Sequence, residues 1–174
     1  MLKKINSNIF LLYSMVFLRF VGGTVFIPSG LLKIQGKRFS AICPEMYADI
    51  FFQQLQSTGI YWNFLGFCQL LTALLLYSQR YTVLAVLMFF CICANIFVFT
   101  VSMGLNDKTL IMVFMLTIAI LLIFWDWNKI RLLLGLNSFE FEIKQQPVPS
   151  LIQITGTVSF VFVVMIFLLT DRYF

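Results

Sequence analysis

Five long apolar stretches, separated by shorter polar segments, dominate the pattern of hydrophobic and polar positions. Each is long enough to cross the roughly 30 Å hydrocarbon core of a bilayer as a helix. The five predicted spans are Ile9–Leu32, Ile60–Tyr77, Tyr81–Ser102, Leu110–Trp127 and Leu151–Thr170. The pattern therefore predicts an all-α membrane protein.

The connections predict how the spans are arranged. Ser78–Arg80 and Met103–Thr109 are short, so the second, third and fourth spans should pack as antiparallel neighbours. Lys33–Gly59 and Asn128–Ser150 are longer. We therefore expect a four-helix unit over residues 1–130, a polar connection over 131–150 and a fifth span within 151–174.

The Lys33–Gly59 connection itself predicts a short helix lying along the membrane interface. Pro44 suits the first turn of a helix. One face of that helix would be apolar. Its apolar residues are Met46, Tyr47, Ile50, Phe51 and Leu55.

Composition excludes a soluble globular domain. The chain is 61% apolar and 11% charged, against about 45–50% and 25% in ordinary soluble domains. The net charge of +5 suits orientation in a membrane, and we expect no nucleic-acid partner. The chain has no histidine, which removes His-containing metal sites and imidazole-based catalysis, and we predict no metal site.

Lysine and arginine outside the spans give a small bias in orientation. With the N-terminus inside, six such residues lie inside and five outside. The pairs Lys3–Lys4 and Lys129–Arg131 tip the balance, so we predict a multi-pass protein of the cell (inner) membrane with a cytoplasmic N-terminus. Most of the tyrosines and tryptophans lie at span ends, as in an interfacial aromatic belt.

Arg19 is the most informative residue, because it lies near the middle of the first span. A central arginine costs about 2.5–3.5 kcal/mol on insertion scales, so its donors need acceptors inside the bundle. The candidates at similar depth are Gln69, Asn95 and backbone carbonyls. A carboxylate partner could come only from Asp126 near a span end, from a ligand or from another subunit.

Small and polar residues recur on one face of each of the first three spans, and we expect these faces to converge on one interior site. They are Gly22, Gly23 and Gly30; Asn63, Gly66, Gln69, Thr72 and Ala73; and Cys91, Asn95, Val98 and Ser102. Three interpretations stay open. The site is a structural hydrogen-bond network, a cavity in which the Arg19 guanidinium binds an anionic or carbonyl-bearing group, or a contact with another subunit.

Lys33 closes the first span after Pro28, Ser29 and Gly30. Pro28 removes a backbone donor and predicts a kink. On one interpretation the kink only redirects the chain and Lys33 extends to the interface. On the other, Lys33 belongs to a basic rim that attracts lipid phosphate or an anionic substrate. The predicted ligand-binding set is Arg19, Lys33, Gln69 and Asn95.

These residues resemble a known family. Phe17–Gly23, which contains Arg19, followed by Pro28–Ile34 with its Gly-x-x-Lys end, is similar to the opening helix of DoxX-like membrane proteins. Leu65–Leu76 is similar to the family's second helix, with Gln69 where an acidic residue is common. Trp125–Asn128 resembles the close of its fourth helix, and the fifth span would be an addition.

The resemblance implies a four-helix membrane module associated with redox systems. Some relatives are small subunits of a thiosulfate:quinone oxidoreductase. Arg19, Lys33 and the position of Gln69 would line the family's polar centre. Because an amide does not titrate, Gln69 puts proton transfer in doubt.

Three hypotheses for function follow. The first is an accessory subunit that contributes a quinone site to a membrane or soluble oxidoreductase, with no built-in cofactor. The second is a transporter or lipid-binding protein that uses the same cavity, and the third is a structural membrane subunit. A self-sufficient enzyme has the least support, because the sequence contains no phosphate loop, thiol pair or acid pair.

Overall fold

The computed structural model describes residues 3–37, 47–135 and 148–170. Within these ranges the chain forms six α-helices and no strand. They are α1 (Lys3–Ile34), α2 (Tyr47–Ser57), α3 (Ile60–Ser78), α4 (Thr82–Ser102), α5 (Asn106–Leu133) and α6 (Ser150–Thr170). Five of them, all but α2, are long and apolar enough to cross a membrane, so the prediction of a multi-pass all-α membrane protein is confirmed at this level.

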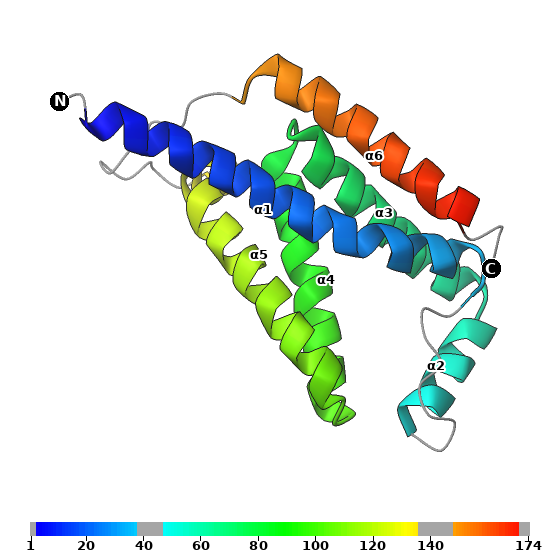
Figure 1. The fold of residues 1–174 in the computed structure, drawn as a ribbon. Helices are drawn as coiled ribbons and strands as arrows, with labels where there is room; N and C mark the ends of the chain where they lie inside the picture. Colours follow the sequence, from blue (N-terminus) through cyan, green and yellow to red (C-terminus); the bar gives the residue numbers. More distant parts are fainter. Residues whose placement is uncertain (1–2, 38–46, 136–147, 171–174) are drawn as a thin grey trace.

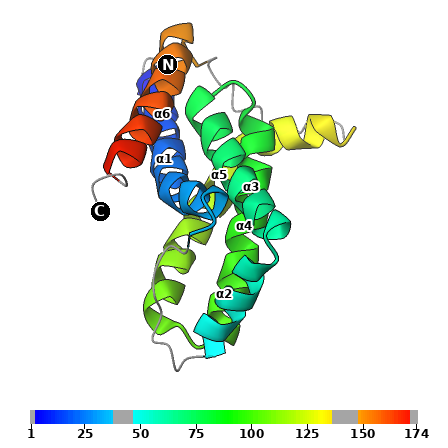
Figure 2. The ribbon, with the colours of Figure 1, turned by 90° about the vertical axis from the view of Figure 1, so that its right-hand side faces the viewer.

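The helices form two packed groups. Helix α1 lies along α3, with α6 against α3 and α1 on the outside (Figure 1). Helices α4 and α5 form an antiparallel hairpin that joins this group through contacts of α4 with α3 and of α5 with α1 (Figure 2). The expected antiparallel packing of the second, third and fourth spans is confirmed.

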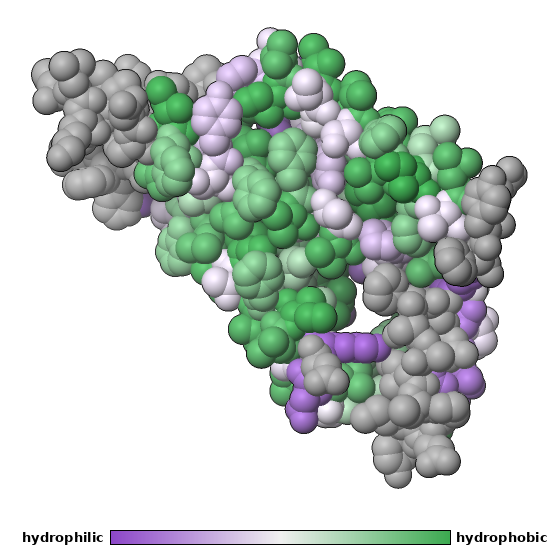
Figure 3. All heavy atoms as spheres, viewed as in Figure 1, coloured by the Kyte–Doolittle hydropathy of each residue, from purple (hydrophilic) through white to green (hydrophobic). Residues whose placement is uncertain are grey.

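The core lies where the two groups meet. Ile27 of α1, Leu76 of α3, Phe89 of α4 and Leu122 of α5 are all fully buried there. Many other large apolar side chains remain exposed, and they cover most of the surface in the view of Figure 3. An apolar exterior around an apolar core is what a bilayer-embedded bundle requires.

Both short turns lie where the sequence predicts them. Gln79 ends α3 in the left-handed conformation at φ 54°, and α4 begins three residues later at Thr82. Helix α5 begins at Asn106, four residues after α4 ends. Helix α6 packs closely on this region, because a Cβ added at Gly156 would lie 2.1 Å from the Tyr77 carbonyl oxygen.

Two predicted boundaries need correction. The first span was predicted as Ile9–Leu32, whereas α1 runs from Lys3 to Ile34 with Pro28 inside the helix. The connection that was predicted to start at Asn128 starts later, because α5 continues to Leu133. Lys129 pairs with Asp126 one turn earlier, and Arg131 lies in the last turn, where cations interact favourably with the helix dipole.

The short helix predicted in the Lys33–Gly59 connection is present as α2, which begins at Tyr47. Pro44 and Met46 lie outside the described residues. This helix lies at the edge of the bundle and packs against the ends of α3 and α4. Phe51 and Phe52 contact Phe99 of α4, with ring centroids 5.0 and 5.1 Å apart, and Phe52 also contacts Trp62 of α3.

Candidate functional site

Two separate polar clusters lie among the spans. The arginine cluster consists of Arg19, Gln79, Asp126 and Lys129. The lysine cluster consists of Ser29, Lys33, Trp62 and Gln69. They lie toward opposite ends of α3, since Gln79 follows its last residue and Trp62 is in its first turn.

In the arginine cluster, a buried guanidinium is held by an acceptor from each of two other parts of the bundle. Arg19 and Asp126 have 2% and 0% of their side chains exposed, and Nη2 lies 2.6 Å from Oδ2. Nη1 donates to Oε1 of Gln79 at 2.8 Å. Within the described residues, the Nε of Arg19 is buried and has no hydrogen-bond partner.

The carboxylate of Asp126 is shared between two cations. Its Oδ1 accepts from Nζ of Lys129 at 2.9 Å, on the side of the cluster where the lysine is 46% exposed. Asp126 thus links α1 to α5, and Gln79 links α1 to the turn between α3 and α4. Removing one member of such a buried pair leaves an uncompensated charge, so the cluster behaves as a structural tie between helices.

The acceptors of Arg19 differ from those that its position in the sequence suggested first. Gln69 and Asn95 do not contact it, whereas Asp126, the one carboxylate considered, does. Residues in the middle of the next spans were the wrong candidates, because Arg19 lies midway along the 32-residue α1 and yet level with the turn that follows the 19-residue α3. Gln79 was missed because it lies outside every apolar stretch.

The lysine cluster holds an ammonium among neutral groups. Lys33 Nζ donates to Ser29 Oγ at 2.6 Å and to Gln69 Oε1 at 3.0 Å. Its contact with the Ser29 carbonyl oxygen is longer, at 3.4 Å, and it lies 5.3 Å from the centroid of the Trp62 ring. Within the described residues no carboxylate pairs with Lys33, so its charge is not neutralised there.

Two glycines create this cluster by letting α1 and α3 approach closely. A Cβ added at Gly66 would lie 2.7 Å from the Gly30 carbonyl oxygen and 2.8 Å from the Lys33 Cβ. A Cβ added at Gly30 would lie 3.0 Å from the Gly66 carbonyl oxygen. The predicted small-residue face is therefore the contact between these helices, and it brings Gln69, which is 5% exposed, within reach of Lys33.

The expected convergence of three helix faces on one site is not observed. Arg19 and Lys33 belong to different clusters, and Asn95 is exposed on the outside of α4. The reason is packing: α4 turns Phe89 and Cys93 inward and leaves its smaller and polar stripe, with Cys91 and Asn95, outside. Cys91 is exposed and Cys93 is buried, since residues two apart on a helix face opposite ways.

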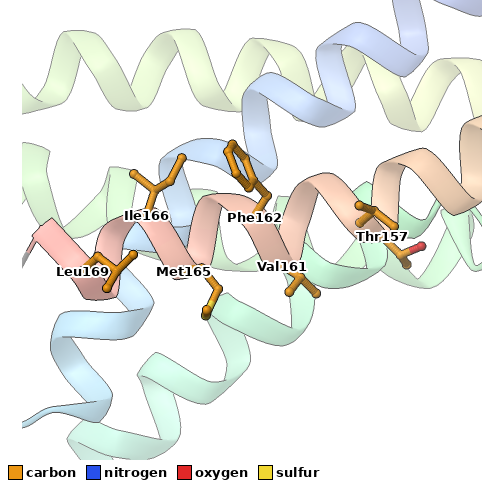
Figure 4. A pocket seen from close by; sticks show the side chains of 7 residues that line it. Thr157, Val161, Phe162, Met165, Ile166 and Leu169 are labelled. Carbon is orange, nitrogen blue, oxygen red and sulfur yellow. The ribbon is translucent and has the colours of Figure 1, made fainter.

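The outer surface of α6 carries a shallow apolar groove. Its lining residues all come from this one helix, among them Phe162, Met165 and Ile166 (Figure 4). None of the four predicted ligand-binding residues lies there. Within the described ranges no three Cys, Asp or Glu side chains lie close enough together to hold a metal ion. Among these features, the lysine cluster is the polar group with an unneutralised charge.

No family model, curated protein or solved structure matches this chain. Membership of the DoxX-like family is therefore not shown, and that resemblance stays a prediction.

Proposed function

We propose that this multi-pass membrane protein is a DoxX-like accessory subunit of a membrane redox system, and that its ligand site is the lysine cluster. The ligand is an amphiphile with an anionic or carbonyl-bearing head, such as a quinone or a lipid phosphate. Arg19 is excluded from direct ligand contact in this proposal, because two of its nitrogens already donate to Asp126 and Gln79.

The observation that carries the proposal is the charge of Lys33. The ammonium has two short hydrogen bonds to neutral oxygens and one long contact of 3.4 Å. An N–H···O contact of that length is weak, so the third donor is the one available to a ligand oxygen. An anionic or carbonyl oxygen there would supply the acceptor that the described residues do not.

The position of the cluster suits a ligand head group. Lys33 is in the last turn of α1 and Trp62 in the first turn of α3, at an end of both spans. Trp62 is 3% exposed and its indole N–H donates to the Lys37 carbonyl oxygen at 3.3 Å. Tryptophan and lysine at a span end are typical of the level of the head groups.

The proposed orientation has the N-terminus in the cytoplasm, in a cell inner membrane. With five spans, the lysine cluster then lies toward the outer face and the arginine cluster toward the cytoplasm. In this arrangement Arg80 follows the end of α3, and Lys129 and Arg131 lie near the end of α5, all on the cytoplasmic side, which agrees with the positive-inside rule.

The experiment is mild-detergent purification followed by mass spectrometry of bound quinones, lipids and proteins. It compares the wild type with Lys33→Met and Gln69→Leu. Arg80→Met is the matched control, because it also removes one cation but from an exposed residue at the other end of α3. We expect the wild type and the control to retain a quinone and a co-purifying oxidoreductase, and both cluster variants to lose the quinone.

Each other outcome corrects a defined part of the proposal. If the wild type retains an anionic lipid in place of quinone, and Lys33→Met loses it, the site stands as a lipid site and the redox role is wrong. If all four proteins carry the same molecules, the lysine cluster is structural and the proposal fails.

A further inference from the structure

The outer face of α4 carries a row of residues with regular spacing. Residues recur at intervals of four, three, four, three and four. The row is Leu84, Met88, Cys91, Asn95, Val98 and Ser102. All but Met88, which is partly exposed, are exposed. The intervals average 3.6 residues, so the row lies along one face of α4, and such a face can form the seam between two packed helices.

Within this row, Asn95 is the polar residue whose side chain lacks a hydrogen-bond partner among the described residues. It lies inside a 21-residue span, and within the described residues its side-chain amide has no hydrogen-bond partner. Ser102, by contrast, donates to the Val98 carbonyl oxygen of its own helix. Since hydrocarbon offers no hydrogen bonds, an exposed amide at this depth favours a protein partner over lipid.

We propose that α4 packs against α4 of a second copy of this chain, with the two Asn95 side chains hydrogen-bonded to each other. The amide carries a positively polarised N–H and a negatively polarised oxygen, so its charges complement those of an identical amide. All copies insert with the same orientation, so the two α4 helices run parallel. A two-fold axis then brings each row residue near its own counterpart.

The rest of the row suits this arrangement. Cys91 and Ser102 are small and allow close approach of the partner backbone, and Leu84 and Val98 supply apolar contact. A single asparagine within such a seam fixes the register and the number of helices. The exposed face of α6 lacks this feature, because Thr157 in its groove donates to the Gln153 carbonyl oxygen of its own helix.

Cys91 provides the test, because it precedes Asn95 by one turn in the same row. In a variant whose other three cysteines are replaced, Cys91 should form an intermolecular disulfide when membrane vesicles are treated with a mild oxidant. Asn95→Leu in that background should reduce the crosslinked fraction roughly 3- to 15-fold, whereas Asn95→Gln should retain most of it. Because Asn95 is exposed in the folded chain, Asn95→Leu should leave the folding of the chain intact.

The control places the only cysteine on another exposed face, as Val158→Cys with Cys91 also replaced; Val158 is 64% exposed on α6. Its crosslinking measures random collision in the membrane. If Cys91 crosslinks no more than this control, or if Asn95→Leu leaves the Cys91 crosslink unchanged, the dimer is wrong. Native mass spectrometry in mild detergent gives a second measurement, in which the wild type should be a dimer of 20.2 kDa chains and Asn95→Leu a monomer.

Discussion

The arginine and lysine clusters place one cation each between α1 and another helix, yet they are built differently. Arg19 meets a carboxylate at 2.6 Å in a site that is almost completely buried. Lys33 is partly buried and meets only neutral oxygens and an aromatic ring. A neutralised charge ties helices together, and an unneutralised one keeps a preference for a further anion or carbonyl oxygen. The comparison thus predicts a structural role for the arginine cluster and, under the proposed function, a binding role for the lysine cluster.

The largest expected effect comes from Asp126→Asn. It leaves the buried Arg19 without a carboxylate, which should destabilise the fold by about 3–5 kcal/mol. Thermal unfolding in mild detergent measures the loss. The double variant Arg19→Met with Asp126→Leu should recover most of it, because no buried charge is then left alone. If the single variant is as stable as the wild type, the ion pair does not hold the bundle together.

A smaller effect is expected from Gly66→Val, which acts on the backbone that forms the lysine cluster. The new Cβ would lie 2.7 Å from the Gly30 carbonyl oxygen, so α1 and α3 must separate. Overpacking of this kind costs roughly 1–3 kcal/mol. Gly59→Ala is the control, since no atom lies within 4 Å of a Cβ there and only its positive φ opposes the change. A fully stable Gly66→Val that still retains ligand would show that close approach is not required.

Gln79→Met tests the neutral acceptor of Arg19. It should cost about 1–2 kcal/mol, because a hydrogen bond to a charged group is lost while the Asp126 pair remains. The measurement is again the unfolding temperature, compared with Gln53→Met on α2, which changes an amide outside the arginine cluster. A loss as large as that of Asp126→Asn would mean that Gln79, and not the carboxylate, secures Arg19.

Lys33→Met should change stability least, by about 1 kcal/mol, because no buried charge is left alone and Ser29 still donates to Gln69 at 3.1 Å. It should nevertheless abolish ligand retention. The two variants should therefore differ clearly: Asp126→Asn should lower stability, and Lys33→Met should prevent ligand binding. Strong destabilisation by Lys33→Met would show that the lysine cluster, like the arginine cluster, stabilises the fold.

The spans were predictable because hydropathy accumulates over 18 or more residues and does not depend on which helices touch. The contact between Gly30 and Gly66 was also indicated, since small residues on one face permit close packing. The partners of Arg19 were harder to find. They depend on how the long α1 lies along the shorter α3 and on the level of the α3–α4 turn, and neither follows from the residues around Arg19.

Asn95 shows a second limit of prediction from the sequence, which concerns the direction in which a helix face points. Its stripe of small and polar neighbours was correctly recognised as a helix face, but periodicity alone does not say whether a face points inward or outward in a membrane protein. In water an apolar face points inward. In a bilayer both faces of α4 are apolar enough, and the larger side chains Phe89 and Val86 fill the interior better than Asn95.

Unequal helix lengths make the bundle responsive to bilayer thickness. The apolar spans of α1 and α5 comprise 26 residues each and that of α3 comprises 19, or about 39 and 28 Å at 1.5 Å per residue. In a hydrocarbon layer of roughly 30 Å, α3 just crosses while α1 and α5 must tilt. A thinner membrane increases that tilt and a thicker one reduces it. We therefore expect a change in bilayer thickness to alter the angle between α1 and α5, which meet at Arg19 and Asp126.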